Sequence, residues 1–337
     1  MYEKIKNDME LWFKDYNNLF QLQEQFLFSL LDHFKDTVIG KERGYQSIKT
    51  IEQFQEKTQI QDYSDIKPYI DRIIAGEQNV ISPAPINCWI QTSGTTGNPK
   101  FFPYSRKYIH NFLKSSSLIP KNFIYRVGSQ ALKILKGKTL LIHASVNSGV
   151  LGTDKNSKKL SLVSGWAATQ SSSQNSFAPP SYIQEIENWE ERILKTAVYY
   201  VQKDLTRLMG VTTYLLMFLR EVENGFDGKL LAELEKENLE RSIIINKFFQ
   251  EDGKLKISKI WKNLLFVNCT GINPYQYQKV FQQIVPQGTL FQSYIGSEGL
   301  YPNFSQNLRS PNTEALQEVG LNRAIADFPN QQSVVRF

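Results

Sequence analysis

Apolar residues near the start of the chain recur at helical spacing. Between Leu11 and Phe34 they fall mostly three, four or seven positions apart, which predicts two amphipathic helices that end near Gly40. A further helix is expected from about Ile48 to Glu56. We therefore expect three regions, namely N-terminal helices over 1–40, a folded core over 41–305 and a divergent or truncated tail over 306–337.

Short apolar runs bounded by proline, glycine and serine predict strands in the first half of the core. Three runs fit this description: APINCWIQ (84–91), GKTLLIHAS (137–145) and KKLSLVS (158–164). The span from 145 to 181 is rich in Ser, Gly and Asn. Because strand-like pieces interrupt it, we expect a long surface excursion there and not a linker between domains.

Helices dominate the next part of the pattern. Ser181 and Gln184 have the spacing of a capping box, and the apolar face that follows predicts one helix as far as Val201. The run LTRLMGVTTYLLMFLREVENGF predicts a short buried segment, a turn at Gly210 and a second helix that ends at Asn224. A charged helix is expected near 229–241.

The last recognisable pattern is strand, helix, strand. It comprises LLFVNCTG, NPYQYQKVFQQIV and GTLFQSYIGSEG, with Pro274 suited to a first helical turn. Alternation of strands and helices is typical of an α/β fold with a largely parallel sheet.

Composition and charge exclude several classes of protein. The formal charge is +6, from 39 Lys and Arg against 33 Asp and Glu, but the basic residues are scattered. Without a zinc-ligand spacing, an aromatic platform or a basic helix, we expect no nucleic-acid partner. No apolar run of about 18 residues and no secretory start are present, so we expect no membrane partner.

Two cysteines and three histidines offer little chemistry. Cys88 and Cys269 are too few for a disulfide framework, which favours a reducing, cytoplasmic location. His33, His110 and His143 have no metal-ligating neighbour at a useful spacing, so we interpret them as partly exposed or as satisfied core residues.

The most informative stretch is IQTSGTTGNPKFFP, residues 90–103. Its glycines let the backbone approach a ligand, its hydroxyls donate hydrogen bonds, and Lys100 adds a positive charge. Such a loop fits a polyphosphate, although its spacing is neither that of a Walker A motif nor Gly-x-Gly-x-x-Gly. On composition alone, a hairpin turn with an exposed lysine is about equally good.

The exact string TSGTTGNPK resembles the signature loop of the adenylate-forming superfamily of acyl-CoA synthetases, luciferases and acyl acid amido synthetases. That superfamily carries a Tyr-x-x-Ser/Thr-Glu element at a strand end about two hundred residues downstream. Here SYIGSEG supplies Tyr294, Ser297 and Glu298. The two elements agree with the superfamily in residue type, order and separation.

Further blocks resemble one branch, the auxin-responsive acyl acid amido synthetases and their bacterial relatives. The stretch QSIKTIEQFQEKTQIQDYSDIKPYIDRIIAGEQNVI resembles the segment that precedes the loop in that family, and IWKNLLFVNCTGINPYQYQ resembles a later one. The resemblance runs from about residue 40 to about residue 303. It implies an α/β fold, the large N-terminal domain of an adenylate-forming enzyme, with mixed and parallel sheets flanked by helices.

The resemblance also implies a nucleotide site. Residues expected around the phosphates are Thr92, Ser93, Gly94, Thr95, Thr96, Gly97 and Lys100. Thr270 and Gly271 would flank the adenine, Tyr294 and Ser297 would complete the site, and Glu298 would hold magnesium. Lys100 and Glu298 are the expected catalytic residues, and Thr270 stands where the family has glycine.

The implied activity uses ATP and Mg²⁺ to activate a carboxylic acid as an acyl adenylate, which an amine, typically of an amino acid, converts to an amide. The alternatives are an acyl-CoA or acyl-protein ligase, or a nucleotide-binding protein without full activity. The family's Tyr-Arg-x-Gly-Asp ribose motif and small C-terminal domain are not recognisable, and YRVGS (125–129) is interpreted as a helix fragment. The acid, the amine and the oligomeric state are not identified.

Overall fold

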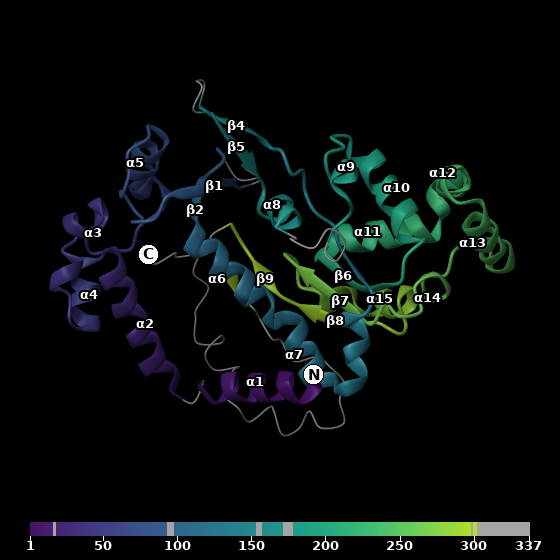
Figure 1. Cartoon of the computed structure of the whole chain (residues 1–337), viewed down its shortest axis with the longest axis horizontal. Helices are drawn as coiled ribbons and strands as arrows, with labels where there is room; N and C mark the ends of the chain where they lie inside the picture. Colours follow the sequence, from purple (N-terminus) through teal and green to yellow (C-terminus); the bar gives the residue numbers. More distant parts are fainter. Residues whose placement is uncertain (16–17, 93–97, 153–156, 171–177, 298, 302–337) are drawn as a thin grey trace. The chain divides into compact units, whose positions relative to one another are not determined.

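The computed structural model describes residues 1–15, 18–92, 98–152, 157–170, 178–297 and 299–301 (Figure 1). They form two compact units. The parallel-sheet unit comprises residues 1–5, 114–149 and the described residues from 161 onward, and the hairpin unit comprises 6–113 and 150–160. The three-region division expected from the sequence stays a prediction.

A four-stranded parallel sheet is the centre of the parallel-sheet unit. Its strands, in spatial order, are β3 (Lys138–Leu141), β6 (Leu205–Val211), β7 (Phe266–Thr270) and β8 (Thr289–Gln292). Parallel strands are covered on both faces and so tend to be apolar along their length. Four of the five residues of β7 are buried accordingly, and the predicted α/β fold is confirmed.

Helices cover both faces of this sheet. The α-helices of the unit are α7 (Leu118–Val127), α8 (Val163–Thr169), α9 (Ser181–Gln184), α10 (Trp189–Tyr200), α11 (Thr212–Glu223), α12 (Lys229–Glu237), α13 (Leu239–Asp252), α14 (Ile257–Ile260) and α15 (Gln278–Ile284). The 3₁₀ helices are η3 (Ser129–Leu135), η4 (Gly225–Gly228) and η5 (Pro274–Tyr277), which confirms Pro274 in a first turn. A short hairpin of β9 (Tyr294–Ile295) and β10 (Leu300–Tyr301) follows β8.

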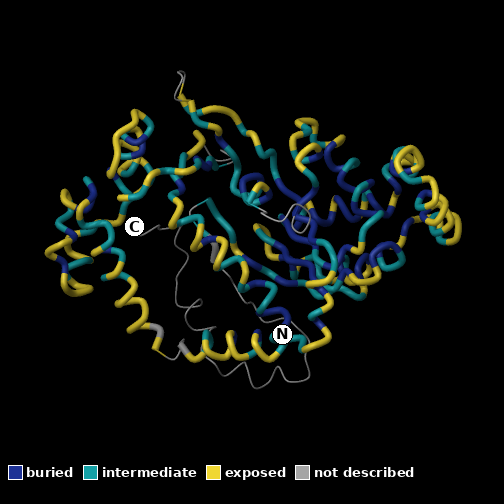
Figure 2. Tube along the Cα trace, in the orientation of Figure 1, coloured by how far each residue is buried: buried dark blue, intermediate teal, exposed yellow. Residues whose placement is uncertain are grey.

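Successive residues of β7 point to opposite faces and meet different helices. Val267 and Cys269 belong to one cluster with buried residues of α10, α11 and α15. On the other face, the ring of Phe266 lies 4.7 Å from the ring of Phe123 in α7. The largest concentration of buried residues therefore follows β6, β7 and α11, as Figure 2 shows.

Trp261 links this core to the sheet through a chain of hydrogen bonds. Its indole Nε1 donates to the carbonyl of Tyr200 at 2.9 Å, and the Tyr200 hydroxyl donates to the carbonyl of Thr139 at 2.8 Å. The ring of Trp261 stacks on Phe218 at 6.2 Å. The buried indole and phenol groups are thus both satisfied, as large buried aromatics require.

The hairpin unit combines N-terminal helices with antiparallel strands. The helices that lie wholly or mostly in it are α1 (Tyr2–Asp15), α2 (Leu19–Phe34), α3 (Val38–Glu42), η2 (Tyr45–Ser47), α4 (Ile51–Lys57), α5 (Tyr63–Ile74) and α6 (Arg106–Ser116). A second sheet has the order β2 (Phe101–Ser105), β1 (Ile86–Gln91), β5 (Lys158–Ser161), β4 (Gly149–Leu151). This sheet contains the antiparallel pair β1–β2, so the expectation of both mixed and parallel sheets is confirmed.

The turn predicted at Gly210 is wrong. Strand β6 continues through Gly210 to Val211. A Cβ at this position would lie 2.9 Å from the Ile142 carbonyl oxygen and 3.0 Å from Cδ2 of Leu215. The glycine therefore permits close packing between the strand and its neighbours, which the sequence pattern does not distinguish from a turn.

The single helix predicted from Ser181 to Val201 is also wrong. The chain forms α9 and then α10, and Asn188 caps the second helix by accepting a hydrogen bond from the Glu191 amide at 2.9 Å. Ser181 lies inside the short first helix and makes no capping bond. Similarly, the strand expected over 158–164 ends at Ser161, and α8 begins at Val163.

Candidate nucleotide-binding site

The loop predicted to bind phosphate connects β1 to β2. These strands pair antiparallel as far as Gln91 opposite Phe101. Beyond that pair, the Thr92 amide donates to the Lys100 carbonyl at 3.0 Å, and the Lys100 amide donates to Thr92 Oγ1 at 3.1 Å. Thr92 and Lys100 are thus brought together.

Five of the predicted phosphate residues lie outside the described part of the chain. They are Ser93, Gly94, Thr95, Thr96 and Gly97. Thr92 and Lys100, which lie on either side of this segment, are joined by the two hydrogen bonds at the end of the β1–β2 hairpin. The side chain of Lys100 is exposed and forms no ion pair with another described residue.

Tyr63 contributes to this site and was missed by the sequence analysis. Its hydroxyl accepts a hydrogen bond from the Phe101 amide at 2.7 Å and lies 3.3 Å from the Phe101 carbonyl. Burial raises the pKa of this phenol, while the hydrogen bond with Phe101 acts in the opposite direction. The only signal for Tyr63 in the sequence is its place in the segment DYSDIKPYI, which was used for the family resemblance alone.

The second group of predicted residues lies at the carboxyl end of β7, in the parallel-sheet unit. Thr270 is the last residue of β7, and Gly271 follows with φ of 77°, in the left-handed region that favours glycine. The hydroxyl of Thr212 lies 3.1 Å from the Thr270 carbonyl and 2.6 Å from the Ile272 carbonyl. This buried side chain at the start of α11 therefore fixes the turn after β7.

Tyr294 and Ser297 belong to the short hairpin after β8. Tyr294 pairs with Tyr301 and is 52% exposed, so it is not the core aromatic that its residue type alone would favour. The amides and carbonyls of Gly296 and Gly299 hydrogen-bond each other at 2.9 and 3.3 Å, which closes the turn that contains Ser297. Glu298 lies outside the described residues.

The second group of predicted residues lies where two neighbouring parallel strands end. The Ser293 amide donates to the Cys269 carbonyl at 2.9 Å, so the β7–β8 ladder continues to the residue before Tyr294. Ligands of parallel α/β sheets bind at the carboxyl ends of the strands. Thr270, Gly271 and Tyr294 all lie at that edge, whereas Thr92 and Lys100 belong to the hairpin unit.

Comparison with known proteins identifies the family. A family model described as the GH3 family N-terminal domain matches residues 12–243, which is more than half of the chain. The chain belongs to the GH3 family. This confirms the resemblance to acyl acid amido synthetases that the sequence motifs indicated.

This GH3 chain is similar to a curated protein over a short stretch and to a solved structure in its fold. The 4-substituted benzoates-glutamate ligase GH3.12 of Arabidopsis thaliana is 37% identical over 89 residues, which are 26% of this chain and 14% of that protein. The solved structure of the GH3.15 acyl acid amido synthetase matches with a TM-score of 0.65 at 18% identity. That match covers 84% of this chain and 54% of the other, so the GH3 chain spans about half the length of that relative.

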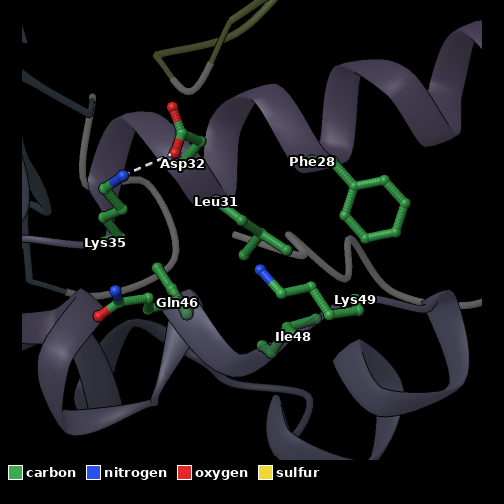
Figure 3. Close-up of a pocket in the computed structure, with 8 residues that line it drawn as sticks. Phe28, Leu31, Asp32, Lys35, Gln46, Ile48 and Lys49 are labelled. Carbon is green, nitrogen blue, oxygen red and sulfur yellow. Dashed lines mark hydrogen bonds and ion pairs between the residues drawn. The ribbon is translucent and has the colours of Figure 1, made fainter.

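A hollow elsewhere in the GH3 chain does not coincide with the predicted site. It has a volume of about 380 Å³ and lies between α2 and the segment Tyr45 to Lys49 (Figure 3). Its lining includes buried Leu31 and Ile48 together with Lys35 and Asp32, and Lys35 donates a hydrogen bond to Asp32 at 2.8 Å. Among the described residues, none of those predicted to bind the nucleotide lines it.

The positions of the histidines in the GH3 chain agree with their interpretation as partly exposed or satisfied core residues, and the cysteines form no disulfide. Nδ1 of buried His143 lies 2.7 Å from the Ala144 carbonyl, and burial lowers the pKa of this imidazole to about 4. His110 is exposed and His33 is half-buried. Both cysteines are free, and burial raises the pKa of the Cys269 thiol to about 12.

The part of the chain that the structure describes has neither a metal-binding cluster nor a membrane-spanning helix. Within this part, no group of three or more His, Cys, Asp or Glu side chains could hold a metal ion. Over the same residues, no helix is both long and apolar enough to cross a membrane.

Proposed function

We propose that this protein activates a carboxylic acid with ATP and transfers the acyl group to an amine, in most cases that of an amino acid. One observation carries the proposal. In a GH3 chain, the two ends of the TSGTTGNPK loop are joined by the Thr92–Lys100 hydrogen bonds, and the Lys100 side chain remains exposed. Such an ammonium group can approach a phosphate without first breaking an ion pair.

In the first half-reaction, a carboxylate oxygen would attack the α-phosphorus of ATP, and the bond to pyrophosphate would break. Negative charge develops on the phosphate oxygens in the transition state, where Lys100 and the loop hydroxyls would stabilise it. Magnesium, held by Glu298, would neutralise further phosphate charge. Thr270, Gly271 and Tyr294 would border the adenine, and the exposure of Tyr294 supports this role because its ring is accessible to a base.

In the second half-reaction, an amine nitrogen would attack the carbonyl carbon of the acyl adenylate. The nitrogen loses a proton, the bond to AMP breaks, and an amide forms. The Arabidopsis relative is named for benzoates and glutamate, which supports an aryl acid and an acidic amino acid as the first substrates to test. Two free cysteines favour the cytoplasm as the location.

Pyrophosphate exchange with the 337-residue chain tests the first half-reaction. Labelled pyrophosphate should enter ATP only when a suitable carboxylate is present, and a panel of aryl and alkyl acids defines the preferred class. Exchange followed by an amide product supports the proposal, whereas a thioester formed with coenzyme A would favour the acyl-CoA ligase alternative. ATP binding without exchange for any acid would instead indicate a binding protein.

Lys100→Ala separates the role of the loop from general effects of charge. We expect it to slow exchange by about 10²-fold or more, because it removes a transition-state charge partner, while ATP binding changes less. Lys107→Ala is the matched control, since Lys107 is an exposed lysine on α6 just beyond the same hairpin. Equal effects of the two substitutions would contradict the role of Lys100. Glu298→Gln should change the dependence of exchange on magnesium concentration.

A further inference from the structure

Tyr63 occupies a well-defined position next to Lys100, the last residue of the predicted phosphate-binding motif. It is the first residue of α5, whose start is fixed by a reciprocal capping box. The Asp62 side chain accepts hydrogen bonds from the amides of Ser64 and Asp65, and the Asp65 side chain accepts one from the Asp62 amide at 2.9 Å. A capping box of this kind satisfies amides that would otherwise lack partners, so the backbone that carries Tyr63 is well determined.

The Tyr63 hydroxyl holds the backbone directly after Lys100. It accepts from the Phe101 amide at 2.7 Å, and its ring lies 6.0 Å from the ring of Phe102. On the other side, Thr92 accepts from the Lys100 amide. The backbone of Lys100 and Phe101 is therefore held by two hydroxyls, that of Thr92 just after β1 and that of Tyr63 at the start of α5.

The ring of Tyr63 also meets the side chain of Lys100. The ammonium nitrogen lies 5.6 Å from the ring centroid, within the range at which the face of an aromatic ring attracts a cation. Hydrogen bonds from Ser64 are the main cause of the lowered pKa of Asp62, and the charge of Lys100 acts in the same direction. An exposed lysine otherwise samples many rotamers, and the ring restricts them.

We propose that Tyr63 is a positioning residue for Lys100, with its hydroxyl fixing the backbone at Phe101 and its ring holding the ammonium group ready for a nucleotide phosphate. The functional part rests on the proposed adenylation, because it takes Lys100 as the phosphate-binding lysine. The structural part, a tyrosine that restricts a lysine, is independent of it.

Three substitutions separate the two contacts. Tyr63→Phe keeps the ring and removes the hydroxyl, whereas Tyr63→Leu removes both. Tyr69→Phe is the matched control, since Tyr69 lies on the same helix and its hydroxyl donates to Glu42, away from Phe101.

NMR of the protein with ¹³C-methylated lysines reads the ring contact, with the Lys100 signal assigned by Lys100→Arg. The signal should show an upfield ring-current shift in the wild type, in Tyr63→Phe and in Tyr69→Phe, and should lose it in Tyr63→Leu. Hydrogen exchange of the Phe101 amide reads the hydroxyl contact. Exchange should become about 2- to 10-fold faster in both Tyr63 variants, as expected for one lost hydrogen bond, and should be unchanged in Tyr69→Phe.

Pyrophosphate exchange then tests the consequence for Lys100. Tyr63→Leu should lower kcat by about 10-fold or more with a smaller change in KM for ATP, because a misplaced group affects the transition state most. Tyr63→Phe should recover part of the loss. A kcat in Tyr63→Leu equal to that of the wild type would overturn the positioning role.

The failure of the proposed function has a different signature. If the wild type shows no pyrophosphate exchange with any acid, the adenylation proposal fails. The NMR and amide hydrogen-exchange measurements still test whether Tyr63 restricts Lys100. A wild-type Lys100 signal without a ring-current shift would overturn the present inference. So would a Phe101 amide whose exchange is the same in Tyr63→Leu as in the wild type.

Discussion

Replacing Thr212 with valine removes the hydroxyl that ties the end of β7 to the start of α11. The Thr212 side chain is fully buried, and its Oγ1 lies within hydrogen-bond distance of the carbonyls of Thr270 and Ile272, at 3.1 and 2.6 Å. Valine is nearly isosteric with threonine and is also branched at Cβ, so it removes the hydrogen bonding with little change in packing. The substitution therefore tests how far this hydroxyl fixes the turn that contains Gly271.

The expected loss of stability follows from these two contacts. One proton is shared between two carbonyls, so the pair counts as about one hydrogen bond, which contributes about 0.5–1.5 kcal/mol. Leaving a carbonyl buried without a partner adds to this cost, up to about 1–3 kcal/mol in total. We expect Thr212→Val to lower the free energy of unfolding by about 1–2 kcal/mol, because the turn can relax enough for water to reach one carbonyl.

Thr206 offers a matched control near the amino end of β6. It is also buried, and its hydroxyl lies 2.8 Å from the Ile134 carbonyl and 3.2 Å from the Lys138 carbonyl. Urea unfolding should therefore show similar losses for Thr206→Val and Thr212→Val. The two variants should differ in nucleotide binding, because only Thr212 contacts the turn predicted to border adenine.

Titration with AMP measures that difference. Thr212→Val should bind AMP about 3- to 10-fold more weakly, which corresponds to about 0.7–1.4 kcal/mol, while Thr206→Val should bind it as the wild type does. If both variants bind AMP equally well, or both lose affinity equally, the carboxyl end of β7 does not border the adenine. The assignment of Thr270 and Gly271 would then be refuted, although the adenylation proposal could still be judged from Lys100.

Three further predictions concern the fold. Burial lowers the pKa of His143 to about 4, so between pH 6.5 and 4 this residue gains a proton mainly in the unfolded state. In urea unfolding, the wild type should therefore lose about 2 kcal/mol of stability from this group between pH 7.5 and 5, and His143→Asn should lose correspondingly less. Gly165→Ala should lower stability by about 1–3 kcal/mol or more, since a Cβ would lie 2.2 Å from the Ser145 carbonyl oxygen, and an unchanged urea midpoint would contradict that packing. Cys269 should resist a thiol reagent at pH 8 until the protein unfolds, because burial keeps it protonated and covered, whereas half-buried Cys88 should react first; equal rates in the native state would argue against the buried β7.

The strands were predictable where the chain itself is apolar. Ile86–Gln91 and Phe266–Thr270 form strands because their apolar runs are bounded by turn-forming residues, and the helices that alternate with the later strands favour a parallel sheet. The pattern of apolar residues gave a wrong prediction at Gly210, where the strand continues, and between α9 and α10, where the helix is interrupted. In both places the outcome depends on a packing contact or a cap that several sequences could supply, so local spacing does not decide it.

Residues that would touch a ligand could be predicted from the sequence, whereas the residues that fix their backbone, Tyr63 and Thr212, could not. Thr92 and Lys100 are recognised from a nine-residue string, whereas the hydroxyl that fixes their backbone comes from Tyr63, 38 residues before Phe101. Likewise, Thr212 lies 58 residues before Thr270. A sequence pattern reports neighbours along the chain, and it contains no information about which distant hydroxyl will meet a given carbonyl once the core has packed.

This difference suggests how the two groups of site residues acquire their rigidity. Each group lies at the end of strands, where ladder hydrogen bonds stop and backbone amides and carbonyls need other partners. In both, a hydroxyl from the first residue of a helix supplies the missing bond, Tyr63 of α5 at Phe101 and Thr212 of α11 at Thr270. The first residue of a helix is held in place by the hydrogen bonds of that helix, so its hydroxyl also fixes the strand end that it contacts. Substitutions of Tyr63 and Thr212 should therefore weaken nucleotide binding or adenylation more than their cost in stability would suggest.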